Sequence, residues 1–287
     1  MKTYILYNPK SDSGKGREEA EAVKQYLKGE EIEFVDAMEK GGYAAFVKSV
    51  QKDDKLVICG GDGTLNRFVN DTDGCELPAK VFYFATGTGN DFLRDLGRET
   101  GSEPVDISKY IVDLPTVTVK GKNYKFLNGI GYGIDGYCCE VGDAQRAKGK
   151  KKINYTGIAI KGLLFHYKTT KATVTVDGKT EEFKKVWLAP TMNGRYYGGG
   201  MIPTPGQDRL KNDTVSTMVM YGKGKIKTLI VFPSIFKGEH VSHSEMVKIM
   251  SGREVTVKFD RPTALQIDGE TILGVTEYTV RSKAAGK

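Results

Sequence analysis

Long apolar runs are missing from this sequence of 287 residues. No run approaches the roughly 18 residues of a membrane-spanning helix, so we expect no such helix. The chain enters a strand-like segment at Tyr4, close to its first residue, and we therefore expect no signal peptide. With 39% hydrophobic and 28% charged residues, the composition is that of a folded globular protein long enough for two domains.

Cysteine frameworks and histidine clusters are missing as well. No two cysteines have CxxC spacing, and the three histidines show no metal-ligand pattern. The four cysteines are Cys59, Cys75, Cys138 and Cys139. Scattered thiols of this kind are typical of a reducing compartment, so we expect a cytoplasmic protein without disulfide bonds and without a zinc site.

An excess of acidic residues is absent too, because 43 Lys and Arg stand against 36 Asp and Glu and leave a net charge of +7. A positive charge favours a polyanionic ligand, an anionic membrane surface or a nucleic acid. The charge by itself does not choose among these three, and the motifs have to decide.

The central motif follows an apolar run at residues 55–59, which predicts a short buried strand. It reads Gly60-Gly61-Asp62-Gly63-Thr64-Leu65-Asn66, and Thr64 opens a helical pattern. Glycines let a phosphate approach backbone N–H groups, and a helix N-terminus attracts an anion. Asp62 would repel a bare phosphate, so its position predicts a Mg²⁺ ion between the two. The alternative is a glycine turn in which Asp62 only caps a helix.

Two further strand exits carry glycines and polar residues. Residues 4–7 are followed by Asn8-Pro9-Lys10-Ser11-Asp12-Ser13-Gly14-Lys15-Gly16, and residues 80–85 by Thr86-Gly87-Thr88-Gly89-Asn90-Asp91. The first loop lacks the glycine spacing of a Walker loop. Short strands alternate with helical patterns through this half of the chain, which predicts a parallel sheet with all three loops at its carboxyl edge.

The pattern changes near residue 115, where predicted strands become frequent. We predict two helical segments, 153–167 and 225–236, and a hairpin turn at Asp177-Gly178. The segments predicted as strands are 116–120, 124–128, 172–176, 182–189, 214–220, 254–259, 264–267 and 277–281. This count favours a second, antiparallel domain of the sandwich type.

These motifs together resemble the diacylglycerol kinase catalytic family, in particular its small bacterial lipid kinases. The matching segments, in order and over nearly the whole chain, are 8–16, 60–66, 87–94, 128–135, 193–200 and 268–270. The resemblance implies an α/β fold with a parallel-sheet nucleotide-binding domain, like that of NAD kinase and phosphofructokinase, over residues 1–115. An antiparallel β-sandwich would follow over residues 116–271, and residues 272–287 would return to the first domain.

The resemblance implies ATP and Mg²⁺ as cofactors and transfer of the γ-phosphate to a lipid hydroxyl, with diacylglycerol as the first choice of acceptor. It assigns to the nucleotide Asn8, Pro9, Ser13, Gly14, Lys15, Gly60, Gly61, Asp62, Gly63, Thr64, Asn66, Gly87, Thr88, Asn90 and Asp91. Asn128 and Asp135 would line the substrate cleft. Asp62 and, in a second site that aligns only after an insertion, Asp213 would bind metal. Arg67 stands where the family usually has Glu.

Asp268 and Glu270 are assigned to catalysis together with Asp62. Residues two apart in an extended segment face the same way, so both could face the acceptor hydroxyl. One of them, Asp268 slightly favoured, would be the general base with a raised pKa. The alternative is a plain Asp-Gly hairpin turn.

A lipid acceptor implies contact with a membrane. Basic runs at 146–152 and 223–227 precede apolar residues, namely Ile153, Ile158, Leu163, Leu164 and Phe165 after the first, and Leu229, Ile230, Phe232, Ile235 and Phe236 after the second. Basic residues beside apolar helices bind anionic membranes, so we expect the lipid substrate at such a surface, peripheral attachment to the inner membrane face, and no nucleic acid partner. Four alternatives stay open: these apolar faces are core, the chain forms a homodimer, it phosphorylates NAD or another small molecule, or it binds ligands without catalysis.

Overall fold

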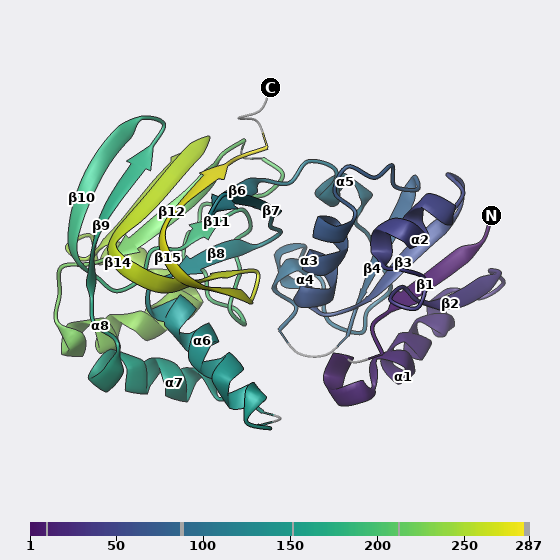
Figure 1. Ribbon diagram of the computed structural model, residues 1–287, viewed down its shortest axis with the longest axis horizontal. Helices are drawn as coiled ribbons and strands as arrows, with labels where there is room; N and C mark the ends of the chain where they lie inside the picture. Colours follow the sequence, from purple (N-terminus) through teal and green to yellow (C-terminus); the bar gives the residue numbers. More distant parts are fainter. Residues whose placement is uncertain (10, 87–88, 151, 212, 284–287) are drawn as a thin grey trace. The chain divides into compact units, whose positions relative to one another are not determined.

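The computed structural model describes residues 1–9, 11–86, 89–150, 152–211 and 213–283, apart from the side chains of Asp12 and Ser13. The chain divides into two compact units, Met1–Asp113 and Leu114–Lys287. Figure 1 shows that the first is an α/β unit and the second is rich in strands. No helix of the described ranges is long and apolar enough to cross a membrane.

The first unit is built on a five-stranded sheet with the order β2-β1-β3-β4-β5. Its strands are β1 (Thr3–Tyr7), β2 (Ile32–Asp36), β3 (Lys55–Gly60), β4 (Lys80–Ala85) and β5 (Val105–Asp106). The first four are parallel, and the short β5 runs antiparallel to β4. The predicted parallel sheet is confirmed, and the chain leaves β1, β3 and β4 at the same carboxyl edge.

One face of this sheet is covered by the first helical segment of the chain. Alternate strand residues face opposite sides, and Ile5, Val57 and Phe84 form a buried cluster with Ala20 and Val23. The last two belong to α1 (Gly16–Glu21) and to the 3-10 helix Ala22–Tyr26 that continues it.

The opposite face is covered by α2 (Tyr43–Ser49), α3 (Asp62–Asp71) and α4 (Asp91–Asp95). The rings of Tyr4 and Phe46 meet edge-on at 5.3 Å, and those of Tyr83 and Phe92 at 6.0 Å. Figure 1 shows α1 on the other side of the strands from α2 and α3.

This arrangement creates a point where the direction of the chain through the sheet reverses. Strand β2 lies on one side of β1 and β3 on the other. In open α/β sheets, ligands bind outside the carboxyl ends of the strands at such a switch point. The topology therefore selects the loops after β1 and β3, which carry the first and the central glycine motifs.

The second unit is an antiparallel β-sandwich organised by one long hairpin, β14 (Glu254–Ile267) and β15 (Glu270–Arg281). Strand β14 pairs with β9 over residues 255–259 and with β8 over residues 265–267. The other strands of the unit are β6 (Thr116–Val119), β7 (Lys122–Lys125), β8 (Gly129–Tyr132), β9 (Thr170–Val176), β10 (Lys179–Val186), β11 (Thr191–Met192), β12 (Val215–Met220) and β13 (Val247–Gly252). The predicted sandwich is confirmed, as is the hairpin turn at Asp177-Gly178.

The prediction that residues 272–287 return to the first domain is wrong for the residues that the structure describes. Strand β15 pairs with β14 along its length and with β6 on its other side. The two-residue turn at Asp268-Gly269 fixes this register, so the strand after it continues the sandwich.

The sandwich has two apolar layers. Its inner core includes Tyr132, Val174 and Tyr278, and the Tyr132 ring stacks on Phe259 at 3.9 Å. A second cluster lies between the sheet and three helices, α6 (Ile134–Ala147), α7 (Tyr155–Lys161) and α8 (Lys225–Val231). Figure 1 shows these helices together on one side of the strands.

Helix α6 and the strands β8, β11 and β13 of this unit were not predicted. The predicted helical segments correspond to α7 with the π-helix Gly162–His166 and to α8 with the 3-10 helix Phe232–Lys237. The strand expected at 124–128 ends at Lys125 instead, because the backbone N–H groups of Leu127 and Asn128 donate to the Asp268 side chain.

Candidate active site

The central turn of the first unit requires glycine where it leaves β3. A Cβ atom on Gly60 would lie 2.5 Å from Thr64 Oγ1, which no real contact allows. A Cβ on Gly63 would meet nothing within 4 Å, so this glycine is exposed and unconstrained by space. The backbone N–H groups of Thr64 and Leu65 donate to the Gly61 carbonyl, and the helix α3 begins there.

Asp62 joins the central turn to the start of α4. Its Oδ2 accepts from the backbone N–H of Asp91 at 2.7 Å, and its Oδ1 accepts from that of Phe92 at 3.2 Å. The structure thus brings the second and third sequence motifs together through this carboxylate. Asp62 is the first residue of α3 and half-buried, so it also places a negative charge at that helix N-terminus.

Tyr83 in β4 also connects the turn after β3 to the loop before α4. Its hydroxyl lies 3.0 Å from the Gly60 carbonyl and 3.2 Å from Asn90 Oδ1. Burial, and to a lesser degree the neighbouring Asp62 carboxylate, raises the pKa of Tyr83 well above its usual range, so the hydroxyl stays protonated. Asn90 in turn donates from Nδ2 to Thr100 Oγ1 at 2.9 Å. Gly87 and Thr88, assigned to the nucleotide, lie outside the described residues.

The first loop folds around the Asn8 carbonyl. The Ser11 backbone N–H and hydroxyl both donate to it, at 3.0 and 2.7 Å. A Cβ on Gly16 would lie 1.9 Å from the same carbonyl oxygen, so glycine is required at this close approach. Of the other residues assigned here, Pro9 is half-buried, Gly14 and Lys15 are exposed, and the Ser13 side chain lies outside the described residues.

The residues assigned along α3 divide into inner and outer positions. Asn66 is buried and accepts at its carbonyl from Asn70 Nδ2. Arg67 is exposed and forms an ion pair with Asp71 at 3.4 Å. Where the family usually has Glu, this chain therefore has a residue on the solvent side of the helix.

In the second unit Asp268 has an interaction that the sequence did not reveal. Its carboxylate accepts from three consecutive backbone N–H groups, those of Leu127 at 2.6 Å and of Asn128 and Gly129 at 2.9 Å each. Such charge-assisted bonds favour the ionised carboxylate. The Asp268 backbone is left-handed, with φ 45°, as the first residue of the two-residue turn between β14 and β15. The Asp-Gly hairpin turn is thus present, and its carboxylate anchors the segment before β8.

Asp268 and Glu270 do not lie in one extended segment, so the argument that they face the same way is wrong. Asp268 and Gly269 both have positive φ, whereas Glu270 is the first residue of β15. Asp268 is half-buried and Glu270 is exposed. The turn between them reverses the chain, and the alternation of a strand does not apply across it.

A buried polar network surrounds the segment that Asp268 binds. Arg209 donates to the Leu127 carbonyl and to Asn128 Oδ1, each at 3.0 Å, although the Arg209 residue is only 7% exposed. Asn193 Nδ2 donates to the same Leu127 carbonyl at 2.9 Å. A guanidinium buried this deeply needs such partners, and here they fix the position of Asn128.

Asp135 is connected to the Asp268 turn through one side chain. Gln266 donates from Nε2 to Asp135 Oδ2 at 2.9 Å, and its Oε1 accepts from the Gly269 N–H at 2.6 Å. Gly131 makes room for this carboxylate, because a Cβ there would lie 1.4 Å from Asp135 Oδ2. Burial raises the pKa of Asp135 to about 6, against the smaller lowering effects of hydrogen bonds from Gln266 and Tyr197.

The second metal site has less support in the structure. Asp213 is exposed, and its backbone carbonyl accepts from the Ser282 hydroxyl at 2.9 Å. Within the described ranges, no three His, Cys, Asp or Glu side chains gather as a metal-binding group. A Mg²⁺ ion at Asp62 does not need such a group, because Mg²⁺ is commonly held by one or two carboxylates together with substrate phosphates and water.

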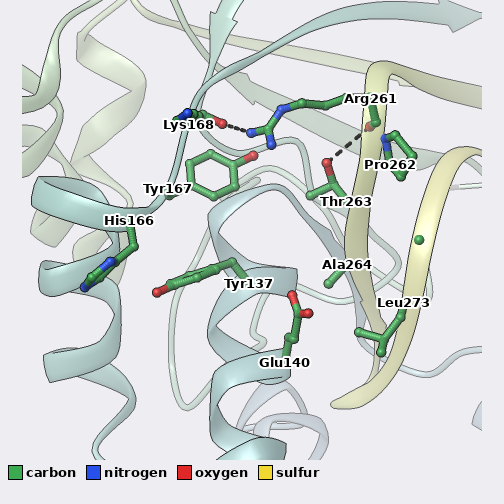
Figure 2. A pocket seen from close by; sticks show the side chains of 11 residues that line it. Tyr137, Glu140, His166, Tyr167, Lys168, Arg261, Pro262, Thr263, Ala264 and Leu273 are labelled. Atoms are coloured by element: carbon green, nitrogen blue, oxygen red, sulfur yellow. Dashed lines mark hydrogen bonds between the residues drawn. The ribbon is translucent and has the colours of Figure 1, made fainter.

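A pocket of about 200 Å³ in the second unit contains none of the predicted site residues (Figure 2). Tyr137 and Glu140 reach it from α6, and Arg261 and Thr263 from β14. The Arg261 guanidinium donates to the Lys168 carbonyl and lies 5.7 Å from the centre of the Tyr167 ring.

Sequence reasoning missed Arg209 and Gln266. Neither belongs to a glycine motif, and single polar residues in a loop or strand carry no local signal. Gln266 lies in an apolar strand pattern, two residues before Asp268, and is buried. A polar residue within an apolar strand needs a hydrogen-bond partner, and this is the signal by which the sequence could have identified it.

Comparison with protein families agrees with this division of the chain. Residues 2–120 match the model described as "Diacylglycerol kinase catalytic domain". Residues 128–283, more than half of the chain, match "YegS C-terminal NAD kinase beta sandwich-like domain".

Among individual relatives, a "Diacylglycerol kinase" of Mycobacterium tuberculosis is 27% identical over 273 residues, covering 91% of this chain and 85% of that protein. The "Putative lipid kinase SERP0390" of Staphylococcus epidermidis is 27% identical over 256 residues, covering 85% and 76%. A crystal structure described as a "putative diacylglycerol kinase" from Bacillus anthracis superposes with a TM-score of 0.69 at 20% identity, over 98% of this chain and 93% of that one. At that identity the superposition establishes the fold.

Proposed function

Because this chain belongs to the diacylglycerol kinase catalytic family, we propose that it transfers the γ-phosphoryl group of ATP to the hydroxyl group of a lipid, with diacylglycerol as the first candidate. Kinase relatives imply a phosphate donor, and ATP is the donor that the family fold uses. The four free cysteines favour a reducing, cytoplasmic setting for the reaction.

The observation that carries the proposal is the arrangement of loops at the switch point of the first unit. The turn after β3 is bonded through Asp62 to the turn after β4, and both lie at the edge where open α/β sheets bind ligands. Gly61 is half-buried, Gly63 is exposed, and neither carries a side chain, so the backbone of this turn is accessible to phosphate oxygens. Lys15 is exposed on the first loop at the same edge and supplies a cation for the phosphates.

The residues present fit a Mg²⁺ ion at Asp62 in the proposed complex with ATP. The ion, when bound, would neutralise charge on the phosphate oxygens during transfer. The chain's own contribution is positional: two backbone N–H groups of α4 hold the Asp62 carboxylate in one orientation beside the central turn. Positioning of this kind is the main work of a protein in phosphoryl transfer.

The proton of the acceptor hydroxyl has to be taken by a carboxylate, and the second unit offers three. Asp268 and Glu270 are the proposed acceptors from the family resemblance. Asp135 is added on the basis of its pKa of about 6, since a general base works best with a pKa near the operating pH. Gln266 connects Asp135 to the Asp268 turn, so replacing either carboxylate is expected to affect the other.

The decisive experiment measures transfer of phosphate from radiolabelled ATP to an acceptor panel in mixed micelles. The panel contains diacylglycerol, a sphingoid base, ceramide and, as the small-molecule alternative, NAD. We expect a phosphorylated lipid and no NADP. Phosphorylation of NAD alone would replace the lipid proposal, and no transfer to any acceptor would favour a non-catalytic binding protein.

Asp62→Asn tests the nucleotide site, with Asp71→Asn as the matched control. Both changes remove one carboxylate from α3, but Asp71 is exposed and forms an ion pair with Arg67 on the solvent side of the helix. Asp62→Asn should lower kcat by roughly 100-fold or more, because the charge that positions the metal and phosphates is lost. Asp71→Asn should stay near the wild-type rate. Equal activity of the two variants would remove Asp62 from the mechanism.

A further inference from the structure

Helix α7, the π-helix that follows it and helix α8 expose apolar side chains that nothing in the described structure covers. The exposed fractions are 42% for Ile160, 73% for Phe165, 75% for Ile226 and 68% for Ile230. We call these four residues the apolar face. Of the apolar residues that the sequence marked in these segments, Ile158, Leu163 and Ile235 are instead buried in the helix-to-sheet core.

Helix α8 lies beside the π-helix that follows α7, and the face is formed there. Lys225 at the start of α8 donates from Nζ to the Leu164 carbonyl at 2.6 Å. Phe165 and Ile226 are the next residues along each segment, so they flank one contact. Ile226 and Ile230 are one helical turn apart on α8, and the inner side of that helix is formed by Thr228 and Val231.

The π-helix at Gly162–His166 explains why Phe165 is exposed. Its wider turn brings residues five apart into line, which places Phe165 one turn beyond Ile160. Ordinary α-helical spacing of four residues would instead align Ile160 with Leu164, which is only half-exposed. The local widening therefore extends the apolar face by an aromatic side chain instead of burying it.

The segments that carry this face are free of acidic residues. The sequence has eight Lys and Arg and no Asp or Glu between Asp143 and Asp177, and four Lys and no Asp or Glu between Asp213 and Glu239. Lys161 ends α7 and Lys168 follows the π-helix, and both are exposed. The basic residues of these segments that form ion pairs include Arg146, with Asp143 at 2.8 Å, and Lys227, with Glu245 at 3.6 Å.

We propose that the apolar face, with the lysines around it, docks on an anionic phospholipid bilayer. Apolar side chains at this exposure gain free energy by entering the boundary between headgroups and acyl chains, and lysines beside them attract anionic headgroups. A protein partner would have to be acidic and apolar at once, whereas an anionic bilayer offers both properties. The inference rests on the proposed function in one respect: a kinase that phosphorylates a lipid has to reach the membrane that contains this lipid.

The test measures binding to sedimenting vesicles in the absence of ATP, so that its result does not depend on catalysis. The vesicles contain equal parts phosphatidylcholine and phosphatidylglycerol, and pure phosphatidylcholine vesicles are the neutral reference. We expect binding to the anionic vesicles, weaker binding at high salt, and little binding to the neutral ones. Binding by the inactive Asp62→Asn variant should equal that of wild type.

The variants Phe165→Ser and Ile226→Ser should each weaken binding about tenfold or more, at low and at high salt. Val112→Ser is the matched control, because Val112 is 75% exposed in the first unit. Lys161→Glu with Lys168→Glu should weaken binding mainly at low salt, and Lys179→Glu, an exposed lysine of β10, should not. All variants should keep the wild-type melting temperature because the changed side chains are exposed.

Two results would overturn the proposal. Vesicle binding unchanged in Phe165→Ser and Ile226→Ser would show that the membrane contact, if there is one, lies elsewhere. A dimer in sedimentation velocity that these variants convert to monomer, with no effect on vesicles, would assign the face to a second copy of this chain. Loss of kinase activity without loss of vesicle binding would count against the proposed reaction and leave the docking surface standing.

Discussion

The Asp268→Asn substitution separates the structural role of this carboxylate from a catalytic one. Asp268 accepts from three backbone N–H groups, and Asn128 and Gly129 share one oxygen while Leu127 uses the other. An asparagine can place its carbonyl oxygen on only one of these sites, so at least one N–H would face an NH₂ group. The left-handed backbone of Asp268, with φ 45°, suits asparagine equally well, and the change adds no backbone strain.

The expected loss follows from these bonds. A hydrogen bond to a charged group contributes about 1.5–3 kcal/mol, and a neutral one about 1. Losing one charge-assisted bond and weakening two others should lower the free energy of unfolding of the second unit by about 3 kcal/mol. For a unit of this size, the melting temperature should fall by roughly 6–12 °C.

The assay uses the single tryptophan of the chain, Trp187, which is buried in the second unit and therefore reports on its unfolding. Denaturant titrations followed by its fluorescence should show a lower midpoint with an unchanged slope. Glu270→Gln is the control, since Glu270 is exposed and should change stability by no more than about 0.5 kcal/mol. An Asp268→Asn midpoint equal to wild type would refute this reasoning, and any loss of kcat would then be assigned to the acceptor chemistry directly.

Two further predictions concern the glycine turn and Asp135. Gly60→Ala should destabilise the first unit and abolish nucleotide binding, because the new Cβ would lie 2.5 Å from Thr64 Oγ1. Gly63→Ala is the control and should keep the wild-type melting temperature, because a Cβ there meets nothing within 4 Å. Equal melting curves of the two variants would contradict the close approach at Gly60. Because the folded-state pKa of Asp135 is raised from 3.8 to about 6, the folded chain holds this proton longer than the unfolded chain, and stability should fall as pH rises from about 4 to about 6. Asp135→Asn should remove that fall and be more stable than wild type above pH 6, by at most about 3 kcal/mol in chemical denaturation, and an identical pH profile of the two proteins would refute the raised pKa.

Much of the first unit was determined by the sequence alone. Short apolar runs that end at glycines, such as the one before Gly60, specify parallel strands and tight exits through local rules. The positions that require glycine are also set locally, because Gly60 is constrained by Thr64, four residues away, and Gly16 by Asn8, eight residues away. For this reason the parallel sheet could be predicted, together with the position of its glycine loops at one carboxyl edge.

The second unit shows what the tertiary structure alone decided. Asp268 meets Leu127–Gly129 and Asp135 meets Gln266 across more than a hundred residues, and no local pattern records such pairs. Helix α6 was missed because glycines and polar residues interrupt its apolar pattern. The exposure of Phe165 depends on the π-helix Gly162–His166, which lies beside α8 and which no local sequence pattern predicted. The sequence shows which residues of a helix are apolar, but whether they are buried depends on how the helices pack on the sheet. Only the structure therefore distinguishes the apolar face from the buried core beneath it.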